Sequence, residues 1–209
     1  MKERGILFQG ALVRGILERR KKKTRRVIKD LKITGPNPPK AAIFDVYRND
    51  KWLGAFGSDG RGNATNLCPY GKPGDRLWVR ETWWQVPEPS LRQLRDGADT
   101  WPKSRVAYDA DESEITREQN HDMGWRLRPS IFMPRLASRI TLEITDVRVE
   151  RVRDISEEDA IAEGVTSKFE FQTLWNSINE KRGYGWNSNP WVWVISFRQV
   201  SAKRVMTAA

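Results

Sequence analysis

The segment Ile16–Arg26, with the sequence ILERRKKKTRR, carries a dense run of cations interrupted by a single hydroxyl, Thr24. Apolar residues precede this run at helical spacing, as in the pair Leu12 and Ile16. This spacing predicts an amphipathic helix that docks on a core and delivers Lys and Thr side chains to one place. From these residues alone, the run is also typical of a solvated charged face with some affinity for nucleic acid.

The composition is that of a folded, basic protein. The chain has 209 residues, of which 38% are hydrophobic and ten are Trp, so it has enough apolar material for a real core. Lys and Arg total 37 against 27 Asp and Glu, which gives a net charge of +10 and favours a polyanionic partner such as RNA or DNA. No apolar stretch approaches the roughly 18 residues of a membrane span, and the N-terminal apolar segment is too short for a signal peptide. We therefore expect a cytoplasmic protein with no membrane partner.

The chain contains one Cys and one His, and this excludes several kinds of chemistry. Cys68 has no partner for a disulfide, and Cys68 and His121 alone cannot supply a zinc site that draws on several such ligands. His121 lies in a polar stretch, Glu118–Gly124, that predicts a surface loop. We therefore expect no metal site and no cofactor, and proton transfers in an enzyme would fall to Lys, Glu, Asp or Tyr.

Periodicity and turn signals predict the main elements of the chain. Ser156 is a good N-cap for a helix that has acidic residues in its first turn and ends before Gly164. The other expected elements are a hairpin over 41–56 with a turn at 48–50, a strand from residue 77, a long or bulged strand over 139–152, an amphipathic helix over 167–181 and a strand over 191–197.

The segment Trp125–Arg135 combines cations, aromatic residues and Met after a loop-rich region. Such a mixture suits a groove in which a base stacks and phosphates pair. It is equally consistent with a covering loop that packs apolar side chains onto the core, because Met and aromatic residues are frequent core fillers.

Several motifs stand in an order that resembles one known family. The motif K-x-x-T-x-R occupies Lys21–Arg26, a turn at Pro73–Asp75 launches a strand that ends in Arg80–Glu81, and an aromatic tail at Trp186–Val194 leads into the last strand. In this order they resemble the ASCH domain, a small β-barrel family related to the PUA RNA-binding fold. The tail is similar to the longer ASCH proteins carried by bacteriophages and prophages.

The resemblance implies an α+β fold. It covers roughly residues 5–35, 70–83 and 128–200. The implied architecture is a single domain over residues 1–209, built on a PUA-like β-barrel with flanking helices and with large loop insertions at 37–66 and 85–128.

The resemblance also implies a reaction. N4-acetylcytidine amidohydrolases of the ASCH type have the early K-x-x-T-x-R motif and a catalytic Glu on a short helix after the long central strand, and that position matches Glu163 here. Lys21 would take a proton from Thr24, the Thr24 hydroxyl would attack the amide carbonyl, and Glu163 would protonate the departing amine. Arg26 would hold a phosphate or the developing oxyanion. Sequence leaves open which of Lys21, Lys22 and Lys23 faces Thr24.

The expected partner is RNA or a nucleoside, with single-stranded nucleic acid favoured. We also expect at least one of Trp83, Trp84 and Trp125 to stack on a base. A core role for all three is equally consistent with their positions, because large aromatic residues dominate protein interiors. A non-catalytic RNA- or DNA-binding module and a ribonuclease are alternative interpretations of the same residues. The predicted binding residues are Lys22, Lys23, Arg25, Arg26, Arg80, Glu81, Trp83, Trp125, Arg128, Ser130, Met133 and Arg135.

Overall fold

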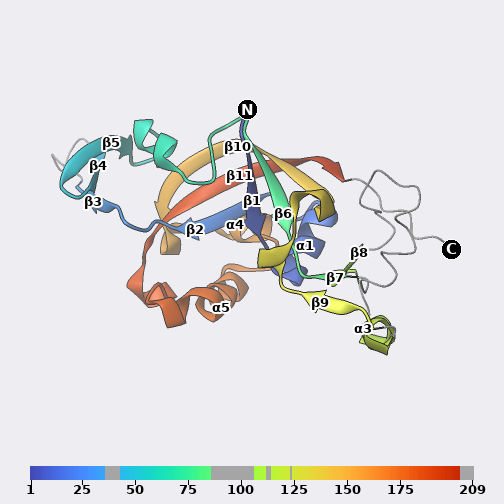
Figure 1. The fold of residues 1–209 in the computed structure, drawn as a ribbon. Helices are drawn as coiled ribbons and strands as arrows, with labels where there is room; N and C mark the ends of the chain where they lie inside the picture. The colour runs from blue at the N-terminus through green and yellow to red at the C-terminus, as the bar shows by residue number, and fades with distance from the viewer. Residues whose placement is uncertain (36–42, 86–105, 112–113, 123, 203–209) are drawn as a thin grey trace. The chain divides into compact units, whose positions relative to one another are not determined.

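The computed structural model describes residues 1–35, 43–85, 106–111, 114–122 and 124–202 (Figure 1). These residues fall into two compact units, and each is described by itself. Unit 1 holds the described parts of Met1–Lys2, Arg19–Arg76 and Glu143–Arg198, and unit 2 holds those of Glu3–Glu18, Leu77–Leu142 and Gln199–Ala209. Residues 36–42 and 86–105, which belong mostly to the two expected insertions, lie outside the described residues. The expectation of a single domain stays a prediction.

The described residues form a mixed α+β structure that is rich in sheet, as predicted. One sheet has the strand order β1-β6-β10-β11-β2, a second has β3-β4-β5 and a third has β8-β7-β9. Within the described ranges these pairings close no barrel. None of the helices described is both long and apolar enough to cross a membrane. The elements are β1 (Glu3–Leu7), α1 (Gly10–Leu17), β2 (Lys23–Val27), β3 (Lys32–Thr34), β4 (Ile43–Arg48), β5 (Lys51–Gly57), β6 (Arg76–Arg80), β7 (Trp83–Gln85), β8 (Val106–Tyr108), α3 (Glu114–Asp122), β9 (Arg126–Arg128), β10 (Ile140–Arg151), α4 (Glu157–Ala162), α5 (Lys168–Asn179) and β11 (Trp191–Ala202).

The predicted hairpin is confirmed as β4 and β5. Arg48 pairs with Lys51 across a two-residue loop, and both loop residues, Asn49 and Asp50, have positive φ (49° and 59°). Asn and Asp tolerate this left-handed backbone, which matches the twist of the flanking strands.

The predicted helix after the central strand is confirmed as α4. β10 runs without interruption for 12 residues. The Ser156 hydroxyl then accepts a hydrogen bond from the backbone N–H of Asp159 at 3.1 Å, and so caps the helix as expected. Gly164 ends it in the left-handed region, with φ of 94°.

Two predicted elements differ in the structure. α1 ends at Leu17, before the cations, because Arg19 takes a left-handed conformation (φ 60°) and the basic run continues as a loop and then as β2. The segment around His121, predicted as a loop, is the end of α3, whose last turn closes with a hydrogen bond from the Gly124 N–H to the His121 carbonyl. His121 is nevertheless exposed, as expected for a surface residue.

Each unit has apolar packing of its own. In unit 1, α5 buries Phe171 and Trp175, and Leu174 packs partly buried against the same cluster, as the predicted helical stripe requires. The other buried members of that cluster are Val152, Ile155, Ala160, Val165, Trp186, Val192 and Val194. In unit 2 a second cluster consists of Trp83, Val106, Tyr108, Met133 and Ala137.

Candidate functional site

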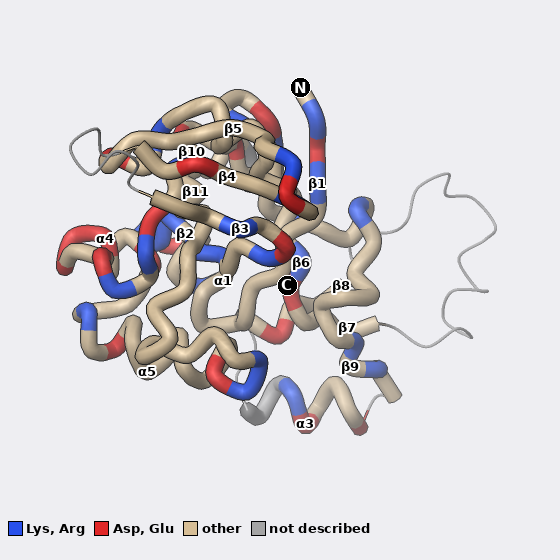
Figure 2. Tube along the Cα trace, turned by 90° about the vertical axis from the view of Figure 1, so that its left-hand side faces the viewer, with Lys and Arg blue, Asp and Glu red and all other residues tan. Residues whose placement is uncertain are grey.

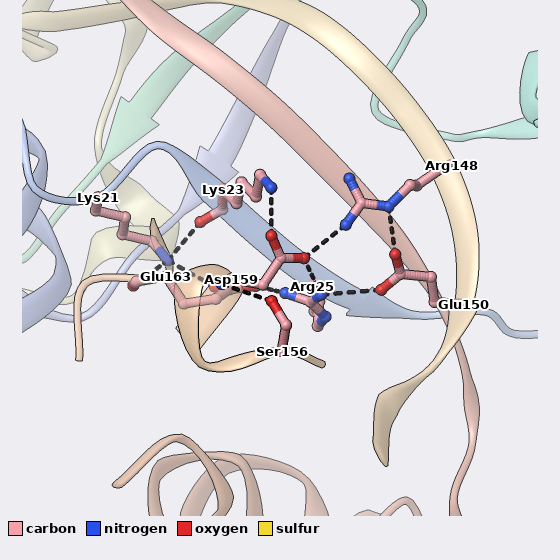
Figure 3. Close-up of polar contacts among 8 residues, drawn as sticks. All are labelled: Lys21, Lys23, Arg25, Arg148, Glu150, Ser156, Asp159 and Glu163. Carbon is pink, nitrogen blue, oxygen red and sulfur yellow. Dashed lines mark hydrogen bonds and ion pairs between the residues drawn. The ribbon is translucent and has the colours of Figure 1, made fainter. Parts of the chain in front are cut away.

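Lys21 and Glu163 meet in unit 1 although 142 residues separate them in the chain (Figure 3). Both are buried, with exposed fractions of 3% and 4%. The Lys21 Nζ donates to the Glu163 Oε2 at 2.8 Å, to the Glu163 carbonyl at 2.7 Å and to the Lys23 carbonyl at 2.8 Å. A buried charge requires such compensation, so this contact fixes the end of α4 against the loop that precedes β2.

The C-terminal end of α4 explains why the contact forms. The last carbonyls of a helix have no partner within the helix and attract cations. Here the Ala162 carbonyl accepts from the Lys22 backbone N–H at 2.7 Å, and the Gly164 carbonyl accepts from the Arg20 Nη1 at 3.2 Å. A side chain at Gly164 would place its Cβ 3.1 Å from the Lys21 Cβ, so this close approach, like the positive φ, favours glycine.

Burial lowers the pKa of the Lys21 ammonium below its ordinary value. The carboxylate of Glu163 opposes this effect by its charge and its hydrogen bond, whereas the positive charges of Arg26 and Arg25 add to it. A lysine whose pKa is lowered in this way is a better candidate for a general base than a solvated one.

Thr24 lies on β2, buried with 4% exposure and paired across the sheet with Ile195. The carbonyl that accepts from the Lys21 Nζ belongs to Lys23, so the ammonium lies against the peptide group that joins Lys23 to Thr24. Of the three lysines that sequence could not separate, Lys21 contacts Glu163, Lys22 is exposed, and Lys23 pairs with Asp159.

An ion-pair network surrounds this contact and links β2, β10 and α4 (Figure 3). The Arg25 Nη2 lies 2.6 Å from the Asp159 Oδ2 and 2.9 Å from the Glu150 Oε2, and its Nη1 lies 3.2 Å from the Glu163 Oε1. Arg148 pairs with Glu150 and also with Asp159, at 2.5 Å to the latter. The cations Lys23 and Arg25, predicted to contact nucleic acid, are therefore compensated by carboxylates of the protein.

Sequence reasoning missed three members of this network, Asp159, Glu150 and Arg148. Asp159 belongs to the acidic first turn of α4, which is coloured red in Figure 2. The helix dipole favours acidic residues in a first turn, so their presence there does not by itself indicate an ion-pair partner. Arg148 and Glu150 are two residues apart on β10 and so share a face of the strand. That alternation predicts a charged face of the strand, but it does not predict that this face pairs with Arg25 of β2 and Asp159 of α4.

Asp159 predicts an acid dependence of stability. Burial alone would raise the pKa of its carboxyl, but the hydrogen bonds from Lys23 and Arg25 lower it from 3.8 to about 2. A pKa depressed by folding contributes stability above the unfolded value and loses it as pH falls toward the folded value. We therefore expect Asp159→Asn to destabilise the protein at neutral pH, with a deficit that shrinks between about pH 4 and pH 2.

Urea denaturation of the wild type and Asp159→Asn across this range measures the deficit. Asp154→Asn, which removes an exposed carboxylate just before α4, is the matched control and should show little deficit at any pH. A deficit for Asp159→Asn that is constant with pH would contradict the assignment.

Arg26 alternates with Arg25 on β2 and is half-buried. Its guanidinium lies over the ring of Tyr70, 5.9 Å from the ring centroid. Burial lowers the pKa of Arg26, and electrostatic interactions with Tyr70 and Glu163 oppose that shift. An arginine remains charged despite such a shift, so Arg26 is a second cation whose charge acts on Glu163.

No protein-family model, curated protein or solved structure matches this chain. Across the described ranges, no three His, Cys, Asp or Glu side chains gather as metal ligands would.

The other predicted binding residues lie in unit 2, and two of them are core residues. Trp83 (4% exposed) and Met133 (1%) pack in the apolar cluster of that unit, and Trp84 is buried as well. Of the three Trp residues expected to offer a stacking platform, Trp125 alone is half-buried. Ser130, in a short 3₁₀ helix, is half-buried too.

Three other predicted binding residues of unit 2, Arg128, Arg135 and Arg80, have protein partners. The Arg128 Nε donates to Gln85 at 2.8 Å, and the exposed Arg135 pairs with Glu3 at 2.8 Å. Arg80 donates to the Ile131 carbonyl and lies over the Trp78 ring. These interactions orient the side chains, and they leave their roles in binding as predictions.

Among the described residues of unit 2, Glu81 is the most deeply buried charge. Its carboxylate, in a residue 1% exposed, accepts two hydrogen bonds from Arg139, at 3.0 Å from Nε and 2.9 Å from Nη2. Burial raises the pKa of Glu81, and the Arg139 guanidinium opposes this shift. Arg139 also pairs with Asp111 and lies 3.9 Å from the ring centroid of Tyr108. This arrangement is that of a structural ion pair.

Proposed function

We propose that this protein hydrolyses the amide of an acylated cytidine, presented as a nucleoside or within single-stranded RNA, and that Lys21, Thr24 and Glu163 carry the reaction. The observation that supports it most is the buried 2.8 Å contact between Lys21 and Glu163, in which the Lys21 ammonium also binds the Lys23 carbonyl that precedes Thr24 in the chain. The proposal includes a PUA-like barrel of the ASCH type, for which the order of the sequence motifs is the support.

The proposed reaction is an acyl transfer to Thr24. Once the Lys21 ammonium has passed a proton to the adjacent Glu163, the neutral amine accepts the hydroxyl proton as the Thr24 Oγ attacks the acyl carbonyl, and Arg26 stabilises the developing oxyanion. Glu163 then gives its proton to the exocyclic amine as the C–N bond breaks. Water hydrolyses the acyl-Thr24 ester, so the products are cytidine and a carboxylic acid. The direct contact of Lys21 with Glu163 supports this proton route.

The compensated cations favour this reaction over the two alternatives. A ribonuclease or a simple binding module needs cations directed at phosphates. Lys23 and Arg25, however, pair with Asp159, Glu150 and Glu163. A buried base and acid at the strand that carries Thr24 suit an uncharged amide better.

The proposal is tested by incubating the protein with N4-acetylcytidine and, separately, with labelled single-stranded RNA. Release of cytidine and acetate supports it, and cleavage of RNA without deacetylation supports the ribonuclease interpretation. Binding of RNA with neither reaction supports a binding module. Glu163→Gln, which keeps the shape of the side chain but removes its proton transfer, should abolish deacetylation.

Exposure predicts which lysine contributes to RNA binding. Lys22 is exposed, whereas Lys23 pairs with Asp159. The logarithm of the RNA-binding constant falls with the logarithm of the salt concentration, and each phosphate contact adds about one unit to the steepness of that slope. Lys22→Ala should make the slope shallower by about one unit, and Lys23→Ala should change it less. Titrations of one RNA at several salt concentrations measure both slopes. Equal slopes for wild type and Lys22→Ala would remove Lys22 from the binding surface.

A further inference from the structure

The two carboxylate oxygens of Glu163 are held by two different cations. Oε2 accepts from the Lys21 Nζ at 2.8 Å, and Oε1 accepts from the Arg25 Nη1 at 3.2 Å. Lys21 takes part in the proposed reaction. The role of Arg25, which sequence alone placed among the nucleic-acid contacts, is a separate question.

Arg25 is itself held from two sides. Its side chain is fully buried, and its Nη2 lies 2.6 Å from the Asp159 Oδ2 and 2.9 Å from the Glu150 Oε2. Asp159 and Glu150 also bind Arg148, and Asp159 binds Lys23 as well. The planar guanidinium therefore has one nitrogen anchored to this network and the other directed at Glu163.

From this geometry we infer that Arg25 is the positioning residue that holds Glu163 toward Lys21, an inference that rests on the proposed function. With Oε1 fixed by Arg25, rotation of the carboxyl group is restricted and Oε2 stays on the ammonium. A guanidinium can do this because its two terminal nitrogens span separate acceptors, whereas the single ammonium of a lysine cannot match that fork.

The charge of Arg25 also acts on Lys21. The groups that face Lys21 are Glu163 from α4 and Arg25 and Arg26 from β2. The positive charges of both arginines disfavour the protonated form of Lys21. Arg25 also pairs with the Glu163 carboxylate, which favours the protonated form. Removing the charge at Arg25 should therefore make Lys21 titrate at higher pH.

Three variants separate positioning from stability. Arg25→Gln removes the charge and the fork, Arg25→Lys keeps the charge without the fork, and Arg148→Gln removes a cation from the same network without touching Glu163. We expect both Arg25 variants to lower kcat for N4-acetylcytidine by about 100-fold with KM little changed, the cost of a misplaced catalytic group. Arg148→Gln should stay within a few-fold of wild type.

A second readout does not need turnover. The ¹⁵N signal of the Lys21 Nζ, followed against pH, should shift to a higher midpoint in Arg25→Gln and stay near wild type in Arg25→Lys and Arg148→Gln. Arg25→Lys keeps a cation in the network and so provides a folded variant should Arg25→Gln fail to fold. For that variant, a lowered kcat with an unchanged lysine titration is the expected signature.

The outcomes are distinct. Wild-type kcat in Arg25→Lys, or an equal loss in Arg148→Gln, would overturn the positioning role. If the wild type does not hydrolyse the amide, the proposed function fails. The lysine titration then still decides whether Arg25 acts on the Lys21–Glu163 pair, and an unchanged midpoint in folded Arg25→Gln would refute that action as well.

Discussion

Thr24→Ala is expected to lower kcat for N4-acetylcytidine by about 1,000-fold or more, because the variant lacks the proposed nucleophile. The affinity for a short single-stranded RNA should stay nearly unchanged, because Thr24 is buried on β2 and the change removes no charge. Thr24→Ser, which restores a hydroxyl at the same position, should recover much of the activity. Steady-state rates and RNA titrations of the three proteins measure these effects.

The same experiment identifies the opposite case. Full activity in Thr24→Ala would mean that the hydroxyl is structural and that water or another group attacks the amide. Circular dichroism and the thermal midpoint of each variant control for misfolding, since Thr24 is packed in the sheet beside Ile195.

The largest loss of stability is expected for Arg139→Met in unit 2. This change leaves the carboxylate of Glu81, in a residue 1% exposed, without the guanidinium that donates two hydrogen bonds to it. Breaking a buried ion pair from one side costs about 3–5 kcal/mol. Burial already raises the pKa of Glu81, so the orphaned carboxyl should take up a proton and limit the loss at low pH.

Arg135→Met is the matched control for this prediction. Arg135 lies four residues earlier and pairs with Glu3, but its side chain is 42% exposed, and such pairs contribute less than about 1 kcal/mol. Urea denaturation of both variants gives the comparison. Similar losses of unfolding free energy for Arg139→Met and Arg135→Met would show that the burial of Glu81 does not determine the effect of Arg139→Met on stability.

Elements that depend on interactions between residues near in sequence, such as helix caps and hairpin turns, could be predicted from the sequence. Ser156 caps α4 because its hydroxyl reaches the backbone N–H three residues on, and Asn49 and Asp50 form the hairpin loop because both tolerate a positive φ. α1 was predicted to continue toward the cations, and it stops at Leu17. Nothing in the run of Lys and Arg marked Arg19 as the residue that would leave helical geometry.

The site was predictable only in part. Lys21 and Glu163, two residues that the family resemblance names, lie in contact, whereas composition alone suggested that the neighbouring cations were directed at phosphates. Asp159 and Glu150 bind Lys23 and Arg25 through tertiary contacts between α4, β10 and β2. Spacing along a chain does not encode such contacts. Trp83 and Trp84, which adjoin the expected insertion at 85–128, are likewise buried by tertiary packing that spacing does not predict.

The short length of α4 has a consequence for how this chain can vary. Glu163 caps a helix of only six residues. In the first turn of this helix Asp159 forms an ion pair with Arg25, and at its end Glu163 binds Lys21 and the Ala162 carbonyl binds the backbone N–H of Lys22. One added residue would advance an α-helix by about 1.5 Å and rotate it by about 100°. An insertion within α4 would therefore disengage Asp159 or Glu163 from its partner, so changes of length are tolerable before Ser156 or after Gly164 but not between them.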